Sequence, residues 1–586
     1  MRSKITTILL SGCLLFGASS CVDIERFEDG RISFEEIFQN DKKTAAYLNR
    51  CYAYIRPYGT EYPGATLLAA FSDESYDTND VLHGSASKWF TGQLTPYYNP
   101  IENGYVTWNH YWTAINYCNV FLSNIDDAVI SSTIDRNSWR AQAYALRAFY
   151  YLQLIKRQGG VPIILEPSSK EFDYSVLKKN SFAECAKQII SDCNEALKAS
   201  DQELTWRPGN VENDRGRLSK AVVHAVRSQA ALYAASPKWN DGTITWEDAA
   251  RITKESLNAC TSKGYSLFRS YPGAQFGHSA YDVYFYTPME VNGGSDRETI
   301  YQTGGRLQIF KYHGLPVVNG MEKAGISPSQ ELIDSYETID GVRPILGYSD
   351  EDHLHPIINP EATLYDEGKP YENRDPRLKA SIYYNGSRFN LNNPNSFVWT
   401  YPGGNCELKS NSSMHTRTGY YLRKYSHFDS NKNTNKDGYF KLFRLAELYL
   451  NAAEAINEAS ASGTAPVEAI NLVNQVRSRV NMKAIPLGIS KDEFRERVRN
   501  ERRVELAFEE HRFFDVRRWN ILDKTDRVVT GMSCEMVNQK PVYTRFVVDN
   551  ERVANNERHL VFPIPGDEVI RLKNLTGIDF QNPGWN

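Results

Sequence analysis

Apolar residues recur at helical spacing in both flanks of the chain. One face of residues 181–197 carries apolar side chains at intervals of three and four: Phe182, Cys185, Ile189, Cys193 and Ala196. This spacing places them on one side of a helix, so we predict an amphipathic helix here. Ser181 precedes the first apolar position and belongs to the residue types that cap helix N-termini.

Five further segments show the same helical pattern. They are residues 108–122, 139–160, 219–237, 441–459 and about 466–480. Gly159 and Gly160 close the second segment and Pro237 stops the third, as these residue types commonly do. Alanines between the large apolar residues let neighbouring helices approach closely, as in stacked helical hairpins. No clean period of about 34 residues accompanies them, so a repeat solenoid is suggested rather than shown.

The character of the chain changes between about residues 266 and 440. Glycine, proline, asparagine and tyrosine dominate there, in runs such as RSYPGAQFGHSAYDVYFYTP and NNPNSFVWTYPGGN. A region this long without strong periodicity, inside a helical protein, is usually either functional or disordered. Its aromatic content argues against disorder. We therefore expect an ordered, loop-rich insertion that presents aromatic side chains.

The composition is that of a folded protein without a nucleic-acid partner. Of the 586 residues, 41% are hydrophobic and 24% are charged, which is ordinary for a globular chain. The 67 lysines and arginines nearly balance 71 aspartates and glutamates. No basic stripe of the kind that neutralises phosphates stands out. The 36 tyrosines indicate a surface or binding protein.

The first twenty residues have the pattern of an export signal. The basic segment MRSK precedes the apolar run ITTILLSGCLLFGASS, and small residues lead up to Cys21. Small residues ending in cysteine indicate a lipobox, in which the cysteine is acylated and becomes the mature N-terminus. Cys13 is the alternative acceptor, and an ordinary secretory signal is the other reading. We favour Cys21, because it leaves a fuller apolar region of about 7–15 residues. No later run of about 18 apolar residues predicts a transmembrane helix.

The cysteines beyond the signal are expected to be buried free thiols. Seven of them are scattered without a CxxC pair: Cys51, Cys118, Cys185, Cys193, Cys260, Cys406 and Cys534. On the predicted helix, Cys185 and Cys193 are two turns apart, or roughly 12 Å along the axis. That separation exceeds the reach of a disulfide.

The stretch ERRVELAFEEHRFFDVRRW, residues 501–519, raises the question of a metal or acid/base site. His511 is the only histidine between His427 and His559, so the paired histidines of a zinc helix are missing. Oppositely charged residues instead recur at i,i+3 spacing: Glu496–Arg499, Arg502–Glu505, Glu509–Arg512 and Asp515–Arg518. Val504 and Phe508 can face inward between them. We therefore predict an amphipathic helix laced with salt bridges and no metal site.

Signatures of catalysis are missing elsewhere in the sequence as well. It contains no GxSxG elbow, no GxxxxGK[ST] phosphate loop and no strand-associated GxGxxG. A pair of glycosidase carboxylates is defined by spatial rather than sequence separation, so the sequence leaves that possibility open with little weight. We expect no catalytic residue and no cofactor.

Seven motifs in order resemble the SusD/RagB family of outer-membrane nutrient-binding lipoproteins. NERRVELAFEEHRFFDVRRWN looks like the signature helix of that family. The others, in chain order, are WRAQAYALRAFYYLQLIKRQGGVPII, GRLSKAVVHAVRSQAALYAASP, SPSQELIDSYETIDG, ENRDPRLKASI, LFRLAELYLNAAEAIN and HLVFPIPGDEV with QNPGWN. The resemblance runs from Cys21 to the last residue.

The resemblance implies a mainly α fold in which four tetratricopeptide-like helical pairs support a loop-rich part. It implies four regions: a signal peptide at 1–20, a helical region at 21–265, a ligand-binding insertion at 266–440 and a helical region with a closing strap at 441–586. It also implies a lipid-anchored protein on the surface of a Gram-negative cell. Such a protein would sit as a lid on a SusC-like, TonB-dependent β-barrel and capture glycans without chemistry. Capture of peptides or another nutrient by the same architecture is the alternative.

Aromatic side chains in loops are the candidates for glycan contact. A sugar offers apolar C–H faces and a ring of hydroxyls, so it requires flat aromatics and orienting polar groups. The candidates are Trp89, Trp399, Tyr284, Tyr301, Asp73 and Arg306. Trp89 and Trp399 lie among Gly, Ser, Asn and Pro, where no helical stripe is predicted to bury them. Asp73 and its neighbours are otherwise read as solvated loop caps or, less favourably, as a calcium site.

Overall fold

The computed structural model describes most of the chain after residue 33. The described residues are 34–59, 66–78, 85–102, 107–169, 172–208, 216–270, 279–289, 296–390, 392–553 and 558–585. The predicted acylation sites Cys13 and Cys21 lie outside these ranges.

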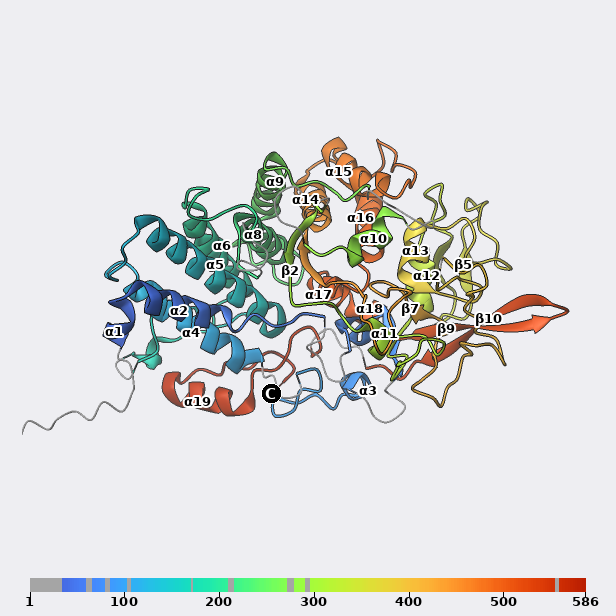
Figure 1. Ribbon diagram of the computed structural model, residues 1–586, viewed down its shortest axis with the longest axis horizontal. Coiled ribbons are helices and arrows are strands. Elements are labelled where there is room, and N and C mark those ends of the chain that lie inside the picture. The colour runs from blue at the N-terminus through green and yellow to red at the C-terminus, as the bar shows by residue number, and fades with distance from the viewer. Residues whose placement is uncertain are drawn as a thin grey trace, which may run out of the picture.

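The N-terminal flank is helical. Its elements are α1 (Phe34–Phe38), α2 (Asp41–Tyr52), the 3-10 helix η2 (Leu68–Phe71), β1 (Ser75–Asp77), α3 (Ser85–Phe90), α4 (Thr107–Asn124), α5 (Thr133–Gln158), the 3-10 helix η4 (Tyr174–Val176), α6 (Phe182–Leu197), α8 (Lys220–Ala235) and α9 (Trp246–Ser262). Helices α4, α5, α6, α8 and α9 pack one on the next in chain order. Figure 1 shows them as one stack on the left of the molecule.

Local sequence explains where these helices begin and end. Ser181 accepts a hydrogen bond from the backbone N–H of Glu184, and the Glu184 side chain accepts one from the Ser181 backbone N–H. This reciprocal capping box satisfies two backbone donors at the start of α6. The predicted N-cap and the predicted helix at 181–197 are both confirmed. At the end of α5, Gly159 adopts φ 71°, a conformation that suits glycine.

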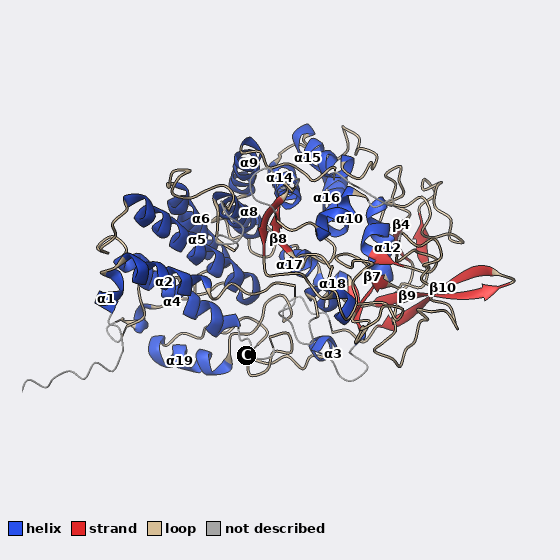
Figure 2. Ribbon diagram, viewed as in Figure 1, coloured by secondary structure: helices blue, strands red, loops and turns tan. Residues whose placement is uncertain are grey.

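The middle of the chain consists of short elements joined by loops. They are α10 (Ala280–Tyr286), β2 (Thr299–Gln302), α11 (Ile309–Tyr312), β3 (Ile326–Pro328), α12 (Gln330–Ser335), β4 (Ile345–Tyr348), β5 (Pro356–Ile358), α13 (Pro376–Ser381), β6 (Ile382–Tyr383) and β7 (Tyr421–Leu422). Within the described residues, each of these strands belongs to a two-stranded antiparallel sheet. Figure 2 shows this loop-rich half beside the helical stack.

The C-terminal flank returns to the helical stack. Its elements are β8 (Lys441–Arg444), α14 (Leu445–Ala459), α15 (Val467–Ser478), α16 (Lys491–Glu505), α17 (His511–Arg518), α18 (Leu522–Thr525), β9 (Val529–Val537), β10 (Lys540–Asp549) and α19 (Gly566–Thr576). Helix α14 packs on α9, and β8 pairs with β2. The helix predicted at 441–459 therefore begins only at Leu445, because the preceding four residues pair as a strand.

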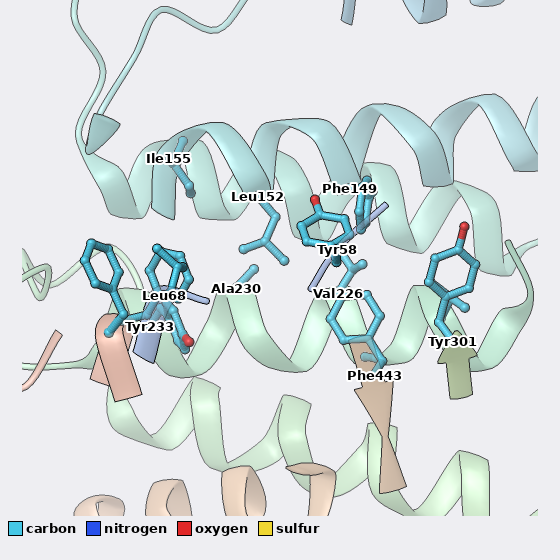
Figure 3. Packing of buried hydrophobic residues seen from close by; sticks show 14 of the residues in the cluster. Tyr58, Leu68, Phe149, Leu152, Ile155, Val226, Ala230, Tyr233, Tyr301 and Phe443 are labelled. Atoms are coloured by element: carbon cyan, nitrogen blue, oxygen red, sulfur yellow. The ribbon is translucent and has the colours of Figure 1, made fainter. Parts of the chain in front are cut away.

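The main core lies where the helical stack meets these two strands. Figure 3 shows Leu152 and Ile155 facing Val226, Ala230 and Tyr233, with Phe443 nearby. Helices α5 and α8 supply the first five of these side chains and β8 supplies the last. The predicted helical periodicity thus corresponds to a real buried face.

All seven cysteines that follow Cys21 are free and buried, as predicted: Cys51, Cys118, Cys185, Cys193, Cys260, Cys406 and Cys534. None of the helices in the described ranges is both long and apolar enough to span a bilayer.

The charged stretch 501–519 departs from the prediction of one continuous helix with a charged outer face. Helix α16 ends at Glu505, and α17 begins at His511 after Phe508 and Glu510 adopt positive φ angles of 61° and 66°. Glu496–Arg499 and Asp515–Arg518 form as predicted, at 3.6 and 2.8 Å. Arg502 and Glu505 do not pair with each other, and neither do Glu509 and Arg512. The turn between the helices redirects these side chains to partners elsewhere in the fold.

Those partners form a buried charge network, which we define as Glu505 and Glu509 with Arg377, Arg444 and Arg479. Arg444 contacts Glu505 at 2.7 Å and Glu509 at 2.6 Å, and Arg377 contacts Glu505 at 2.9 Å. Arg479 also pairs with Glu505. All five side chains are almost inaccessible to solvent. The network therefore ties α16 to β8, to α13 and to the residue that follows α15 inside the molecule.

His511 is part of this interior. Burial and the nearby cations, Arg502 first among them, hold the pKa of His511 well below its ordinary value. Its Nε2 lies 4.0 Å from the Glu447 carboxylate. Within the described residues, no group of three or more His, Cys, Asp or Glu side chains is arranged to hold a metal ion.

Candidate functional site

Three aromatic rings project from one side of an extended segment in the loop-rich half. Residues 396–401 alternate: Ser396, Val398 and Thr400 are buried, whereas Phe397, Trp399 and Tyr401 are partly exposed. Successive side chains of an extended chain point to opposite faces, so this alternation places the three rings together. We call Phe397, Trp399 and Tyr401 the aromatic ladder.

The rings of the aromatic ladder are in contact with one another. Phe397 and Trp399 are stacked, with centroids 5.3 Å apart and planes at 28°. Trp399 and Tyr401 follow at 5.7 Å and 42°. These separations are typical of favourable offset aromatic pairs. The result is a run of three partly exposed, mutually contacting rings on one side of the segment.

Hydrogen bonds hold the backbone of the aromatic ladder in place. The Asn405 side chain accepts from the Trp399 backbone N–H and donates to the Phe397 carbonyl, both at 2.9 Å. Cys406 N–H donates to the Trp399 carbonyl at 2.9 Å. A Cβ on Gly404 would lie 2.3 Å from that carbonyl oxygen, so only glycine fits there. The rings are therefore presented by a preorganised segment, which limits the entropy cost of binding.

A second group of aromatic residues adjoins the aromatic ladder through Asn385. The Asn385 Oδ1 accepts from the Thr400 backbone N–H at 3.0 Å, and its Nδ2 lies 3.5 Å from the Tyr543 hydroxyl. Tyr371 packs edge-on against Tyr543 and stacks on Tyr384 at 4.3 Å. Burial raises the pKa of Tyr384 to about 12, so its hydroxyl is protonated at neutral pH.

Trp399 is among the candidates predicted from the sequence, whereas Tyr384 and Tyr543 are not. These two tyrosines come from segments that are distant in sequence and meet only in the fold. The run YYNG at 383–386 was the available signal for Tyr384, because it places tyrosines beside a turn residue. No comparable signal marks Tyr543, which lies in an alternating strand.

The prediction that Trp89 lies in an unburied loop is wrong. Residues 85–90 form the short helix α3, and Trp89 is only 1% exposed. Its ring packs edge-on against His559 at 5.2 Å and Phe562 at 5.7 Å, both from the segment between β10 and α19. Contacts from the distant end of the chain therefore bury a tryptophan whose local sequence is polar. It offers no face to a glycan in this structure.

Tyr284 and Tyr301 are also core residues rather than exposed platforms. The Tyr284 hydroxyl lies 2.9 Å from Thr299 Oγ1, and burial raises its pKa well above the ordinary value. The Tyr301 hydroxyl donates to the Gly216 carbonyl at 2.9 Å. Figure 3 shows Tyr301 packed with the other core side chains at the level of α8. Strand pairing between β2 and β8 accounts for the burial of Tyr301.

Asp73 and Arg306 have structural partners. Arg512 binds the Asp73 carboxylate with two hydrogen bonds of 2.7 and 2.8 Å, and Arg503 approaches to 2.8 Å. Burial alone would raise the pKa of Asp73, but Arg503 and Arg512 outweigh it and lower that pKa to about 2. Asp73 is thus neither a solvated loop cap nor a calcium ligand. The exposed Arg306 donates to the backbone carbonyls of Lys436 and Asp437 at 2.9 and 2.7 Å.

A separate concave surface lies at the opposite flank of the fold. It encloses about 580 Å³ between residues 95–102 and the start of α19. Tyr97, which is 70% exposed, and Tyr98 line it, together with Pro563, Pro565 and Arg571. The sequence PYYNP was the signal for this pair, since prolines on both sides disfavour a buried helix.

Comparisons with known proteins identify the relatives of this chain. The model of the SusD family matches residues 285–585, and a model described as starch-binding associating with outer membrane matches residues 43–205. SusD-like protein P2 of Formosa agariphila is 23% identical over the full length of both chains. A SusD-like protein of Bacteroides fragilis superposes with a TM-score of 0.73 at 25% identity, covering 94% of this chain and 98% of its own.

A second solved structure, described as a SusD-like carbohydrate binding protein of Bacteroides fragilis, has a TM-score of 0.64 at 21% identity. The superposition covers 92% of this chain and 99% of that one. At this identity the likeness concerns the fold. It agrees with the mainly helical architecture of packed helix pairs described above.

Proposed function

The chain belongs to the SusD family of non-catalytic carbohydrate-binding proteins associated with the outer membrane, and from that membership we propose that its aromatic ladder captures an oligosaccharide. We propose further that the protein is anchored by acylated Cys21 at the cell surface. From there it delivers the glycan to a SusC-like, TonB-dependent transporter.

The aromatic ladder is the observation that supports glycan capture most strongly. Three partly exposed rings in line match the repeating apolar faces of a linear oligosaccharide. Each ring contributes stacking of about 0.5–1.5 kcal/mol beyond the area it buries. The Asn385 amide and the Tyr384 and Tyr543 hydroxyls stand nearby as polar groups that can orient sugar hydroxyls. A shallow, preorganised site of this kind binds and releases without a catalytic group.

The direct test is calorimetry of purified protein against a glycan panel. The panel contains starch oligosaccharides, because residues 43–205 match a family model described as starch-binding. It also contains plant, fungal and host glycans. Trp399→Ala should weaken binding of the best glycan about ten- to a hundredfold, at 1.4 kcal/mol per tenfold. Its Tm should stay within a few degrees of wild type, because Trp399 is partly exposed on a surface segment.

Trp246→Ala is the matched control. This tryptophan is also partly exposed, but it starts α9 in the helical stack, away from the aromatic ladder. The control should bind the glycan like wild type. Unchanged affinity in Trp399→Ala would contradict the site, and binding of peptides with no glycan bound would favour peptide capture instead.

A further inference from the structure

A small polar pocket is lined by residues of α12, β4, α16 and α18. It encloses about 200 Å³. Its charged lining consists of Asp73, Glu331, Asp334, Arg343, Arg503 and Lys524. Tyr348 and His353 form a stacked pair in the wall, with ring centroids 4.1 Å apart and planes at 14°. We call this space the α12 pocket.

The carboxylates of the α12 pocket are already occupied. Glu331 accepts from the Thr530 hydroxyl at 2.7 Å and from the Thr530 backbone N–H, and His353 Nδ1 lies 3.1 Å away. Asp334 accepts two hydrogen bonds from Arg545, at 2.7 and 2.8 Å, and one from the Tyr348 hydroxyl at 2.8 Å. Asp73 is held by two arginines, as described above. These three acids are therefore poor ligands for an added cation.

Two cations of the α12 pocket are not neutralised in the same way. The Nε of Arg343 is buried and has no hydrogen-bond partner within the described residues, where no carboxylate pairs with its guanidinium. The Lys524 side chain is exposed and likewise has no ion pair in the part of the chain that the structure describes. Because neither cation has a carboxylate partner in the described residues, both charges are available to an incoming anionic group.

The charge balance of the pocket is positive. Its lining holds three carboxylates and three cations, Arg343, Arg503 and Lys524. Two further cations outside the lining, Arg512 and Arg545, pair with Asp73 and Asp334. This arrangement leaves about two positive charges without a counter-charge among the lining residues and their direct partners. A guanidinium presents planar paired donors that match a carboxylate or sulfate group.

We propose that the α12 pocket binds an anionic oxyacid group of the captured glycan, a uronate carboxylate or a sulfate ester, through Arg343 and Lys524. This inference rests on glycan capture as the function, and it specifies an acidic glycan.

Strand β10 connects the pocket with the aromatic ladder. Arg545 contacts Asp334 in the pocket, and Tyr543 adjoins Asn385 beside the aromatic ladder. Residues two apart on a strand lie on the same face, about 7 Å from each other. Neighbouring residues of β10 therefore contact both the α12 pocket and the surroundings of the aromatic ladder.

The experiment compares oligosaccharides that differ in charge. The probes are maltohexaose as the neutral chain, oligogalacturonate as the uronate and a carrageenan oligosaccharide as the sulfate ester, with glucuronate and inorganic sulfate as the isolated groups. Calorimetry of wild type should show binding at least about tenfold tighter for one acidic chain than for the neutral chain. The preferred acidic chain identifies which oxyacid the pocket takes.

Arg343→Gln should remove this preference and leave binding of the neutral chain unchanged. Lys524→Gln should reduce it several-fold, and because Lys524 is exposed this second variant keeps the fold if the first does not. Lys369→Gln is the control: it removes the same charge from an exposed side chain paired with Glu372. It should bind every probe like wild type.

The outcomes separate this inference from the proposed function. If wild type binds a neutral chain through Trp399 and shows no acidic preference, or keeps its preference in both variants, the anionic subsite is wrong and glycan capture stands. If no chain binds but glucuronate or sulfate binds with dependence on Arg343, the subsite stands and the proposed capture of oligosaccharides fails.

Discussion

Glu74 is a buried carboxyl group beside a charged one. Burial, and then the neighbouring Asp73 charge, raise the pKa of Glu74 from 4.5 to about 8. Neither of its carboxyl oxygens has a side-chain hydrogen-bond partner within the described residues. The folded protein therefore keeps Glu74 protonated at neutral pH, while the unfolded chain ionises it.

We predict that Glu74 makes the fold less stable as pH rises from about 4.5 to 8. The unfolded state releases the proton first, so the free energy of unfolding falls through this window and changes no further above it. Glu74→Gln should remove this pH dependence of the free energy of unfolding. Thermal unfolding measured from pH 5 to 9 should show that the Tm of the variant increases relative to that of wild type up to pH 8.

The exposed carboxylate variant Glu496→Gln is the control, and it should follow the wild-type pH profile. Parallel profiles for wild type and Glu74→Gln would show that Glu74 is ionised in the folded protein.

Single residues also show how far local sequence predicts a site. Trp89 and Trp399 both lie among small and polar neighbours, yet only Trp399 stays partly exposed. The difference arises from His559 and Phe562, which reach Trp89 from the other end of the chain. The unpaired Arg343 could not be recognised either, because the sequence does not say which carboxylates find partners. Exposure at these positions is a tertiary property.

At the scale of elements, the buried charge network joins α16 to three other segments. Glu505 contacts Arg444, Arg377 and Arg479. Burial alone would raise its pKa, but these arginines outweigh burial and hold the pKa of Glu505 well below its ordinary value. The carboxylate thus balances several guanidinium charges that have no access to water.

We predict that Glu505→Ala destabilises the protein by about 3–5 kcal/mol, because it leaves buried arginines without their counter-charge. Urea unfolding measures this change. Glu496→Ala, on the outer face of the same helix, should cost less than about 0.5 kcal/mol, since exposed ion pairs contribute little. A loss of similar size in both variants would contradict the distinction.

Helix existence was predictable from periodicity, whereas boundaries and long-range partners were not. The period of apolar positions located α6 and α8 because their buried faces are continuous. Residues 441–444 also contain apolar positions, but pairing with β2 makes them a strand. The turn between α16 and α17 interrupts a stretch whose i,i+3 charges suggested one helix. In both cases a partner distant in sequence decided the local conformation.

At the scale of the whole molecule, the proposed lipid anchor can be tested by detecting its acyl group. We predict that labelled palmitate is incorporated into the expressed protein, that Cys21→Ala abolishes it and that Cys13→Ala does not. One chain gives only about 10⁴ M⁻¹ of membrane affinity, so stable attachment requires several. The reverse pattern would move the anchor to Cys13, and no incorporation in wild type would exclude a lipid tether.

The contact between α9 and α14 has a consequence for how such a protein can change over generations. The chain leaves the helical stack after Ser262 and rejoins it at Leu445, and these two helices are packed neighbours. The intervening loop-rich segment therefore begins and ends at two helices that pack against each other. Doubling the length of a flexible loop costs only about 0.6 kcal/mol. Insertions, deletions and recombination between genes can thus change the loop-rich half while the helical scaffold is inherited unchanged.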